Sequence, residues 1–582
     1  MAKFFITNDK VLAVRIKNNI ESSIFTLCAE IQEGNIYAFS CKKLCVNNNN
    51  FMHDTRGNFV IATGTYLYES GGLNCFLEVE EDDVKTVRSK MFGQYAVVTL
   101  KGTRLTVFCD AVGAYEVYYY NADGIFVISN DLYDMARVLS EKLTVNQNNI
   151  LEMALQNAIL CNETYFHEIN RLDGVEVINV DVKSNIFKID YTDVPLPRIC
   201  DSEYEHIKEA TALSLKNKAR AFAEHFGSPD IFMTGGLDAR LSLAAYLSIG
   251  QKPTLNYAKG NCFLTNTNDA DYQIVILISK HYGLTLHKHD WSHPYLLNRD
   301  WPELMHKYGF DSLAYYGSKS VFHSFYSLDN VLNTFGYGGE LYRNDDWVQD
   351  YSNEMFSIDY YLDYCYLNKS GVYDVNLLPG YRDHIKAKLL KICKRYHINP
   401  EQIPVRDYIY LDYEYRRTAH SVMLNVLNKY RYSNLLLLEY DTVRSIFMNS
   451  TYKSGSRYQI DLINELYSGV LEIPIFSHIQ HRKLNRDTMT LEVLENSSTH
   501  SSARPRLSFI KSPVFRLAGR KILETLHMIT PQIDTNVFVK DYDKHHRLSS
   551  NSLLKMPIDS RYQIMYIMLN EIIRDLTEKK YE

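Results

Sequence analysis

The sequence predicts an α+β layered sandwich at the N-terminus, followed by an α/β domain with a parallel sheet and a helical C-terminal part. Short strand-like runs dominate the first 190 or so residues, and strands alternate with helices between residues 230 and 290. The length of 582 residues favours two to four domains with ample buried core.

Composition and charge exclude several classes of protein. Hydrophobic residues make up 46% and charged residues 23%, as in an ordinary globular protein, and the net charge of -6 lacks the basic balance of a nucleic-acid binder. No apolar run is long enough to span a membrane, and the opening "MAKFFITNDKVLAVRIK" has no signal-peptide core. The ten cysteines include no zinc-like pair of CxxC motifs. We therefore expect reduced thiols, a cytoplasmic location, and neither a nucleic-acid nor a membrane partner.

The first domain is expected to span residues 1–195. Runs such as "FGQYAVVTL", "RLTVFCD" and "GIFVISN" cluster β-branched and aromatic residues between turn residues such as Lys101–Gly102 and Asp123–Gly124. This pattern is typical of a β-meander within a layered α+β domain.

The second domain is expected at 200–480, after a connector with two prolines, "TDVPLPRICDS". A helix begins near Ser202, and residues 230–290 then read strand, turn, helix, strand, helix, strand, which predicts βαβ units and a parallel sheet. Helical patterns dominate from about 350 to 480. A helical extension is expected at 481–582, with a mobile loop near 496–506 and a last helix at 561–576.

The stretch "IFMTGGLDARLSLAAYL", from Ile231, predicts a strand, a glycine turn and a helix. Thr234 to Asp238 form the turn, whose free N–H groups favour an anion, while glycine allows close approach. Asp238 would repel a phosphate unless a divalent cation lay between them, so it points to Mg²⁺. The alternative is a tight turn with an acid near a helix N-terminus.

A second loop, "VLNTFGYGGELYRNDDW" (331–347), carries three glycines around Tyr337 and Glu340 after another apolar run. Two strand-end loops with one acid each fit a nucleotide-phosphate site with Mg²⁺ between Asp238 and Glu340. The alternative is two independent glycine turns. The sequence has no GxxxxGK[ST] and no strand-linked GxGxxG, so neither a Walker-type nor a dinucleotide site is expected.

These motifs carry a family resemblance. "MTGGLDAR" resembles the SGGxDS pyrophosphate loop of ATP-pyrophosphatase domains, specifically in the asparagine synthetase and β-lactam synthetase-like family. "GYGGE" resembles that family's GxGxD loop, "DYQIVILISKHYGL" its helix after the second strand, and "EYDTVRSIFM" stands where it has its PFLD block. In the N-terminal part, residues 92–120 and 163–177 resemble the glutamine-amidotransferase segment and the linker that follows it.

The resemblance implies an Ntn-hydrolase-like first domain without glutaminase activity. Family members that hydrolyse glutamine start the mature chain with a cysteine, whereas here the second residue is Ala2. The family's Asn-Gly oxyanion element is replaced by Thr63-Gly64, and its substrate-binding acid by Phe92. We therefore expect this domain to serve as a scaffold.

The second domain is then implied to be an ATP-dependent, AMP-forming carbon–nitrogen ligase. It would adenylate a small-molecule or peptide carboxylate, release pyrophosphate and join the acyl group to an amine donor, using ATP and Mg²⁺. The resemblance also allows a homodimer. The resemblance assigns ATP and pyrophosphate binding to Met233, Thr234, Gly235, Gly236, Asp238, Tyr257 and Gly336. It assigns the metal to Asp238 and Glu340, and catalysis to Tyr337 and Arg457.

Three departures from the family pattern keep a second hypothesis open. Ala239 replaces the last serine of the loop, residues 430–440 offer no acid to pair with Tyr337, and the family's late lysine has no clean match. Arg457 is the nearest cation and Lys453 a weaker candidate, although both could be exposed loop charges. The alternative is a catalytically inactive protein of the same family that binds a nucleotide or a partner.

Overall fold

The computed structural model describes most of the first 475 residues and little of the rest. The described residues are 2–47, 50–68, 84–156, 158–192, 203–259, 261–262, 265–266, 269–291, 319–343, 357–367, 380–395, 399–401, 419–443, 456–475, 482–485 and 490–493, with the single residues 310, 397, 445, 569, 573 and 576. Lys453 and the predicted loop at 496–506 lie outside them.

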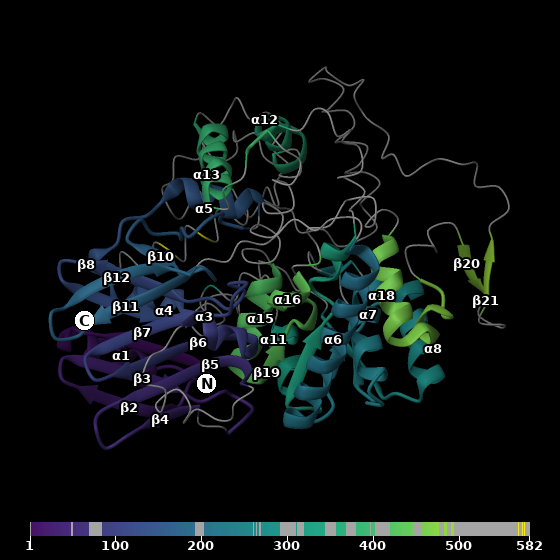
Figure 1. Ribbon diagram of the computed structural model, residues 1–582, viewed down its shortest axis with the longest axis horizontal. Coiled ribbons are helices and arrows are strands. Elements are labelled where there is room, and N and C mark those ends of the chain that lie inside the picture. Colours follow the sequence, from purple (N-terminus) through teal and green to yellow (C-terminus); the bar gives the residue numbers. More distant parts are fainter. Residues whose placement is uncertain are drawn as a thin grey trace, which may run out of the picture.

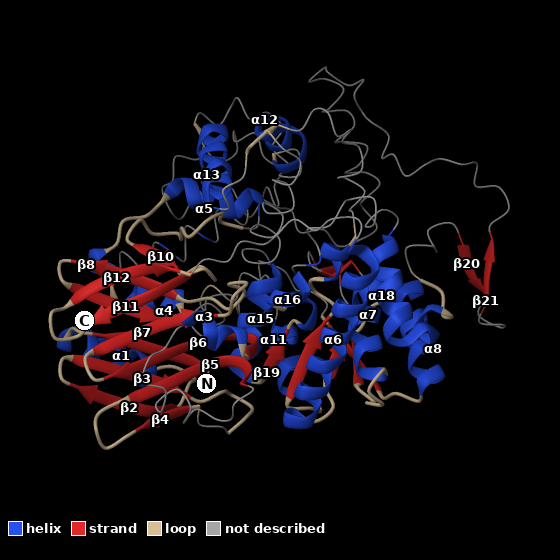
Figure 2. Cartoon of the chain, viewed as in Figure 1, coloured by secondary structure: helices blue, strands red, loops and turns tan. Residues whose placement is uncertain are grey.

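Two six-stranded antiparallel sheets stack in the N-terminal part (Figures 1 and 2). The first has the order β10-β8-β9-β1-β3-β2 and the second β12-β11-β7-β6-β5-β4. Strands of the first sheet are β1 (Lys3–Thr7), β2 (Leu27–Glu33), β3 (Ile36–Cys41), β8 (Tyr118–Ala122), β9 (Ile125–Ser129) and β10 (Ile169–Arg171). Those of the second are β4 (Phe51–His53), β5 (Phe59–Tyr68), β6 (Met91–Lys101), β7 (Arg104–Cys109), β11 (Glu176–Asp181) and β12 (Ile186–Tyr191).

Strand β1 explains the layering. All five of its residues are buried, because both faces of the first sheet are covered. Phe4 and Ile6 point into the core between the sheets, whereas Phe5 points to the other face, as the two-residue period of a strand requires. Three helices pack on that other face: α1 (Lys10–Glu21), α4 (Leu132–Val138) and α5 (Gln147–Gln156). The short helix α3 (Val84–Ser89) packs on the outer face of the second sheet.

A five-stranded parallel sheet forms the centre of the second part, in the order β17-β14-β13-β18-β19. Its strands are β13 (Asp230–Phe232), β14 (Thr254–Lys259), β17 (Leu286–Asp290), β18 (Leu332–Phe335) and β19 (Tyr432–Asn434). The chain runs outward from β13 to β17 and then returns to β18 on the other side of β13. The strand order therefore reverses between β13 and β18, the position where open α/β sheets bind ligands.

Helices surround this sheet: α6 (Tyr204–Phe226), α7 (Leu237–Leu247), α8 (Asp269–Tyr282), α11 (Lys319–Tyr326), α15 (Ala419–Tyr430), α16 (Tyr440–Val443) and α18 (Arg457–Tyr467). The other described elements are α12 (Ile358–Tyr360), α13 (Tyr381–Arg395), the short 3₁₀ or π helices η1 (Ser140–Lys142), η3 (Gly339–Tyr342), η4 (Tyr361–Tyr366), η8 (Leu436–Leu438) and η11 (Ser468–Leu471), and the two-stranded pairs β15 (Asn261–Cys262) with β16 (Thr265–Asn266) and β20 (Arg482–Asn485) with β21 (Thr490–Val493).

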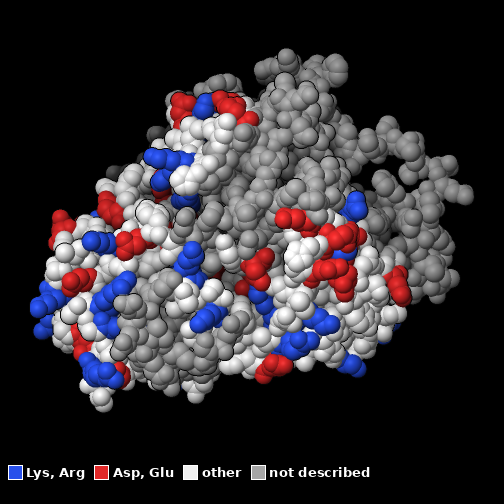
Figure 3. All heavy atoms as spheres, in the orientation of Figure 1, with Lys and Arg blue, Asp and Glu red and all other residues white. Residues whose placement is uncertain are grey.

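The mixed α/β class with a parallel sheet, predicted from the sequence, is confirmed in outline. Of the predicted last helix, Leu569, Ile573 and Leu576 are helical and buried in the same cluster as α1 and α4. Among the described helices, none has both the length and the apolar character needed to cross a bilayer. On the face shown in Figure 3, acidic and basic side chains are interspersed over the described residues.

The two parts meet along α15, β19 and η8. Lys43, 4% exposed, donates its ammonium to the backbone oxygens of Asn428 and Arg431, at 2.5 and 3.0 Å. The Thr65 hydroxyl donates to the Asn428 side chain at 2.8 Å and accepts from the Ser433 backbone N–H at 2.7 Å. Among the described residues, the hydrogen-bond partners of the Lys43 ammonium and the Thr65 hydroxyl lie across the junction, so the junction fixes how the two parts pack.

A buried charge network crosses the same junction. Asp131, at the start of α4, lies 2.8 Å from the Lys3 ammonium and 2.9 Å from that of Lys429 on α15, and Lys3 also pairs with Asp134 at 2.7 Å. Burial alone would raise the pKa of Asp131, but the two lysines outweigh burial and hold that pKa well below its usual range. The carboxylate therefore stays charged and stabilises the junction at neutral pH.

We predict that Lys429→Met lowers the free energy of unfolding by roughly 1.5–3 kcal/mol, since it removes a charge-assisted bond inside the protein. Urea unfolding followed by circular dichroism measures this, with Lys142→Met, on the exposed end of η1, as a control expected to change stability by about 0.5 kcal/mol or less. Because the folded-state pKa of Asp131 is lowered, the difference between wild type and Lys429→Met should shrink below about pH 4. Equal effects of the two substitutions would contradict the role of the network.

Candidate functional site

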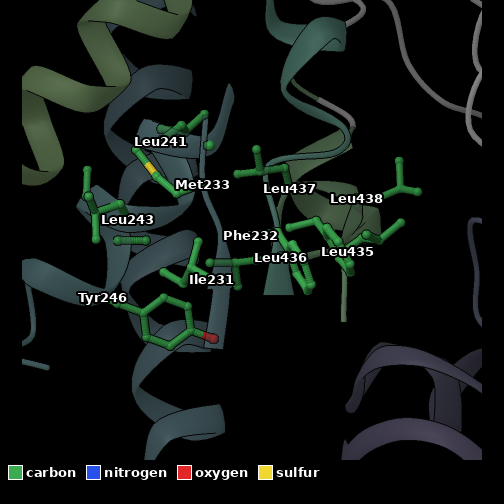
Figure 4. Packing of buried hydrophobic residues seen from close by; sticks show 14 of the residues in the cluster. Ile231, Phe232, Met233, Leu241, Leu243, Tyr246, Leu435, Leu436, Leu437 and Leu438 are labelled. Atoms are coloured by element: carbon green, nitrogen blue, oxygen red, sulfur yellow. The ribbon is translucent and has the colours of Figure 1, made fainter. Parts of the chain in front are cut away.

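The two predicted glycine loops follow the two strands at which the sheet order reverses. Phe232, the last residue of β13, pairs in register with Phe335, the last residue of β18. Their rings stack at 5.0 Å with 8° between planes, and Tyr337 continues the stack on Phe335 at 5.0 Å and 12°. Both loops therefore leave the same edge of the sheet, side by side. Figure 4 shows the apolar packing around β13, where Ile231 and Phe232 belong to one buried cluster with residues of α7 and the leucines of η8.

The glycines bring the two loops against each other. A Cβ on Gly339 would lie 2.5 Å from the Cβ of Asp238, and one on Gly336 would lie 2.4 Å from the backbone nitrogen of Ala239. Such distances are far inside van der Waals contact, so these positions accept only glycine without a backbone shift. Gly338, with φ of 95°, supplies the left-handed turn between them. The sequence interpretation of these glycines as a close approach to a ligand is therefore incomplete, since Gly336 and Gly339 approach the first turn of α7.

Asp238 is the centre of the polar contacts at this edge. It lies in the first turn of α7, with its side chain 21% exposed. One carboxylate oxygen accepts from the Gln459 amide at 2.6 Å, and the other pairs with the Arg343 guanidinium at 3.1 Å. Gln459 is fully buried and also donates to the Gly339 backbone oxygen at 3.2 Å. One amide thus ties Asp238 to the second loop.

Gly235 is held from behind by Asp271 of α8. Its backbone N–H donates to an Asp271 carboxylate oxygen at 2.6 Å, and the Tyr257 side chain also hydrogen-bonds that carboxyl group. Burial raises the pKa of Asp271, although these donors counteract it. The predicted role of Gly235 in pyrophosphate binding stays a prediction, and its N–H already binds a carboxylate of the protein. Tyr257 likewise lies behind the loop, 1% exposed.

Met233 and Thr234 lie on either side of the end of the strand. The Met233 side chain is buried in the core, and its N–H donates to the Asn256 backbone oxygen at 2.8 Å. Thr234 is exposed at the tip of the turn, and its hydroxyl accepts from the Gly236 N–H at 3.4 Å. Of the predicted phosphate-binding set, Thr234 is therefore exposed and Gly236 and Asp238 are half-buried, whereas the other members are buried.

Arg240 fixes the first loop to the segment after α18. It is fully buried, and its guanidinium donates to the backbone oxygens of Val470 at 2.7 Å, Ile473 at 2.6 Å and Gly235 at 3.3 Å, and to that of Pro474. Burial lowers the pKa of Arg240 to about 10. An arginine is well suited here, since its fork of donors satisfies several carbonyls at once.

Glu340 and Tyr337 are both half-buried on the second loop, with Glu340 in η3. Among the described residues, no group of three or more acids, histidines or cysteines could hold a metal ion. Mg²⁺ needs only one or two carboxylates when phosphates and water complete its shell, so Asp238 and Glu340 are a chemically suitable pair. Arg343 already occupies one oxygen of Asp238 and would compete with a cation there.

Arg457 is the predicted catalytic residue that the structure turns away from this edge. Gln459 of the same helix contacts Asp238, and residues two apart on a helix do not share a face. The Arg457 guanidinium lies over the Tyr204 ring at 5.6 Å and 3.7 Å from Asp461, with its side chain 61% exposed. Its predicted role as the active-site cation stays a prediction, which this position does not favour.

Arg343 is the cation that sequence reasoning missed. It lies three residues after Glu340, as the extended C-cap residue of η3. A cation three residues after the loop acid is visible in the sequence, so Arg343 could have been predicted as a site residue. Gln459 and Asp271 come from helices far along the chain and carried no such signal.

Comparisons with known proteins add little to this geometry. No protein-family model and no curated protein matches the chain. The glutamine phosphoribosylpyrophosphate amidotransferase of B. subtilis, complexed with ADP and GMP, aligns with 51% of this chain and 67% of its own, at 8% identity and a TM-score of 0.21. A structure of the allosteric regulatory enzyme of purine biosynthesis aligns with 50% of this chain and 82% of its own, at 8% identity and a TM-score of 0.23. TM-scores this low establish neither a shared fold nor a shared activity.

We predict that Gly339→Ala destabilises the protein by about 1–3 kcal/mol, because its Cβ would collide with Asp238 and force the loops apart. Gly236→Ala is the matched control: the nearest atom to its Cβ would be 3.6 Å away, and its φ of -79° suits alanine. Urea unfolding of both variants tests this. If both alanines are tolerated equally, the loops do not depend on this contact.

Proposed function

We propose that this protein is an ATP-dependent amide-bond-forming ligase of the asparagine synthetase type, which adenylates a carboxylate and passes the acyl group to an amine. One observation carries the proposal: two acid-bearing glycine loops interlock at the point where the strand order of a parallel sheet reverses. That edge is where α/β sheets bind nucleotides, and the helix N-terminus behind Asp238 favours phosphate.

In this proposal Asp238 and Glu340 hold Mg²⁺, which neutralises phosphate charge when bound. Thr234 and Gly236 face the pyrophosphate group from the tip of the first loop. The substrate carboxylate forms a bond to the α-phosphorus while the bond to pyrophosphate breaks, and the amine then bonds to the acyl carbon as AMP leaves. Tyr337, stacked on Phe335, is the candidate base for the amine, and a phenol of ordinary acidity needs a nearby charge for that task.

The proposal excludes glutamine hydrolysis as the source of the amine. Ala2 at the start of β1 is fully buried and carries no thiol. Phe92 packs its ring on Phe222 of α6 at 6.4 Å, where the family has an acid for its substrate. The amine therefore comes from free ammonia or from the substrate itself.

A second candidate, a non-catalytic nucleotide- or partner-binding protein, is favoured by a specific observation. Asp238 is paired with Arg343 and Gln459, and the Gly235 N–H with Asp271, so protein groups occupy positions that ligands would need. Ala239 also lacks the hydroxyl of the family's serine.

We predict carboxylate-dependent exchange of labelled pyrophosphate into ATP with the full chain, Mg²⁺ and pooled carboxylates. Asp238→Asn and Glu340→Gln should each reduce it at least about a hundredfold, since each removes a metal ligand. Asp290→Asn, at the end of β17, is the control and should retain activity. Binding of Mg·ATP without exchange would favour the non-catalytic candidate, and no binding at all would refute the ligase and leave only a partner-binding protein.

We further predict that Arg343→Met weakens Mg·ATP binding about tenfold or more, because Arg343 is the cation beside Asp238 that can turn to phosphate. Arg457→Met should leave binding within about twofold, since its guanidinium lies over Tyr204. Isothermal titration calorimetry measures both. The reverse order of effects would restore Arg457 as the active-site cation.

A further inference from the structure

A cavity lies between the outer face of the second sheet and the parallel-sheet part, away from the glycine loops. It has a volume of about 470 Å³, within the usual range for small-molecule sites. Its walls come from β6 and α3 on one side and from α6 and the η8–α16 segment on the other. Neither part encloses it alone, so the cavity exists only in the assembled chain.

Lys218 of α6 brings a buried ammonium group to this cavity. The residue is 7% exposed, and its hydrogen-bond partner is a carboxylate oxygen of Asp441, which also accepts from the Ser214 hydroxyl. Burial lowers the pKa of Lys218, although Glu439 counteracts it. An ammonium has three donors, and among the described residues Asp441 takes one, so two remain for a ligand.

Glu439 brings a buried carboxylate to the same cavity. It accepts from the Gly93 N–H at 3.0 Å and from the Gln94 amide at 3.2 Å, both across the junction. Burial raises its pKa, and Lys218 opposes that shift. Tyr95, 2% exposed, also lines the cavity, and burial raises its pKa well above 10, so its hydroxyl remains a proton donor.

The charged side chains around the cavity disfavour a ligand that carries only a positive or only a negative charge. Arg88 and Asp110 also line the cavity, but their charged groups are already bonded within the protein, to two backbone oxygens and a hydroxyl and to three backbone N–H groups, respectively. A simple anion would pair with Lys218 but would meet the carboxylates of Glu439 and Asp441, whereas a simple cation would compete with Lys218 for those carboxylates. Each arrangement leaves a like-charge contact beside the buried Lys218 and Glu439, which is costly.

We propose that this cavity binds a small zwitterion, an α-amino acid, between the two parts of the chain. Its carboxylate accepts from Lys218 and Tyr95, and its ammonium donates to Glu439 and Asp441. Both signs of charge are then paired, and the side chain of the ligand lies on the apolar wall formed by Met91, Phe92, Val112 and Leu438. This site is independent of the nucleotide chemistry proposed above.

The test is calorimetric titration of the full chain with each of the twenty common amino acids. We expect at least one to bind, and its carboxamide and N-acetyl derivatives to bind at least about tenfold more weakly, since each keeps a single charge. Acetate and methylammonium serve as single-charge probes and should not bind. If no amino acid binds at 10 mM, or if a single-charge probe or derivative binds as tightly, the proposal is overturned.

Variants locate the binding. Lys218→Met should weaken it at least about tenfold, whereas Lys216→Met, two residues away on another face of α6, should leave it unchanged. Leu213→Trp is a second variant, which keeps the test valid if Lys218→Met does not fold. Leu213 is 59% exposed at the cavity, so a larger ring there narrows the cavity opening without altering charge. Binding that survives both Lys218→Met and Leu213→Trp would place the ligand elsewhere.

Discussion

The contact between two glycine loops at the centre of the parallel sheet is the constraint on which the candidate site depends. With Gly339 against Asp238 and Gly336 against Ala239, the first turn of α7 and the start of η3 share a backbone-to-backbone surface. Side chains on the two loops are thereby placed relative to each other by main chain, which is stiffer than any side-chain contact. This contact therefore fixes the loop that carries Glu340 against the helix turn that carries Asp238.

Buried polar and charged side chains then restrict the movement of the two loops further. Arg240 ties the first loop to the segment after α18, and Gln459 ties Asp238 to the Gly339 carbonyl. Asp271 holds the Gly235 N–H from behind. Each of these groups is largely buried and multiply bonded, so its loss would leave a polar atom without a partner. A loop held this way keeps its shape whether or not a ligand is present, which reduces the cost of binding.

Local signals explain what could be predicted from the sequence. The strand, turn and helix could be predicted because their signals are contiguous: the apolar run at 231–233, the glycines, and the helical spacing after Ala239. The position of Asp238 in the first turn of the helix could be predicted for the same reason. Contacts with distant segments could not be predicted in this way, since Gln459 is more than two hundred residues from Asp238 along the chain. Arg457 was predicted from its charge alone, whereas the helix presents Gln459 to Asp238. The contact of the Gly235 N–H with Asp271 could not be predicted either, because Asp271 belongs to no motif.

The segment η8 connects the candidate site with the junction of the two parts. Leu437 packs on Gly338 of the second loop, and its carbonyl accepts from the Tyr342 hydroxyl at 2.8 Å. Two residues later, Glu439 accepts from Gly93 of the N-terminal part. The three consecutive residues 437–439 therefore contact both the second loop and the N-terminal part. An N-terminal part without glutaminase chemistry would still be needed, because it supplies the donors that keep the buried Glu439 satisfied and so fixes η8 beneath the second loop.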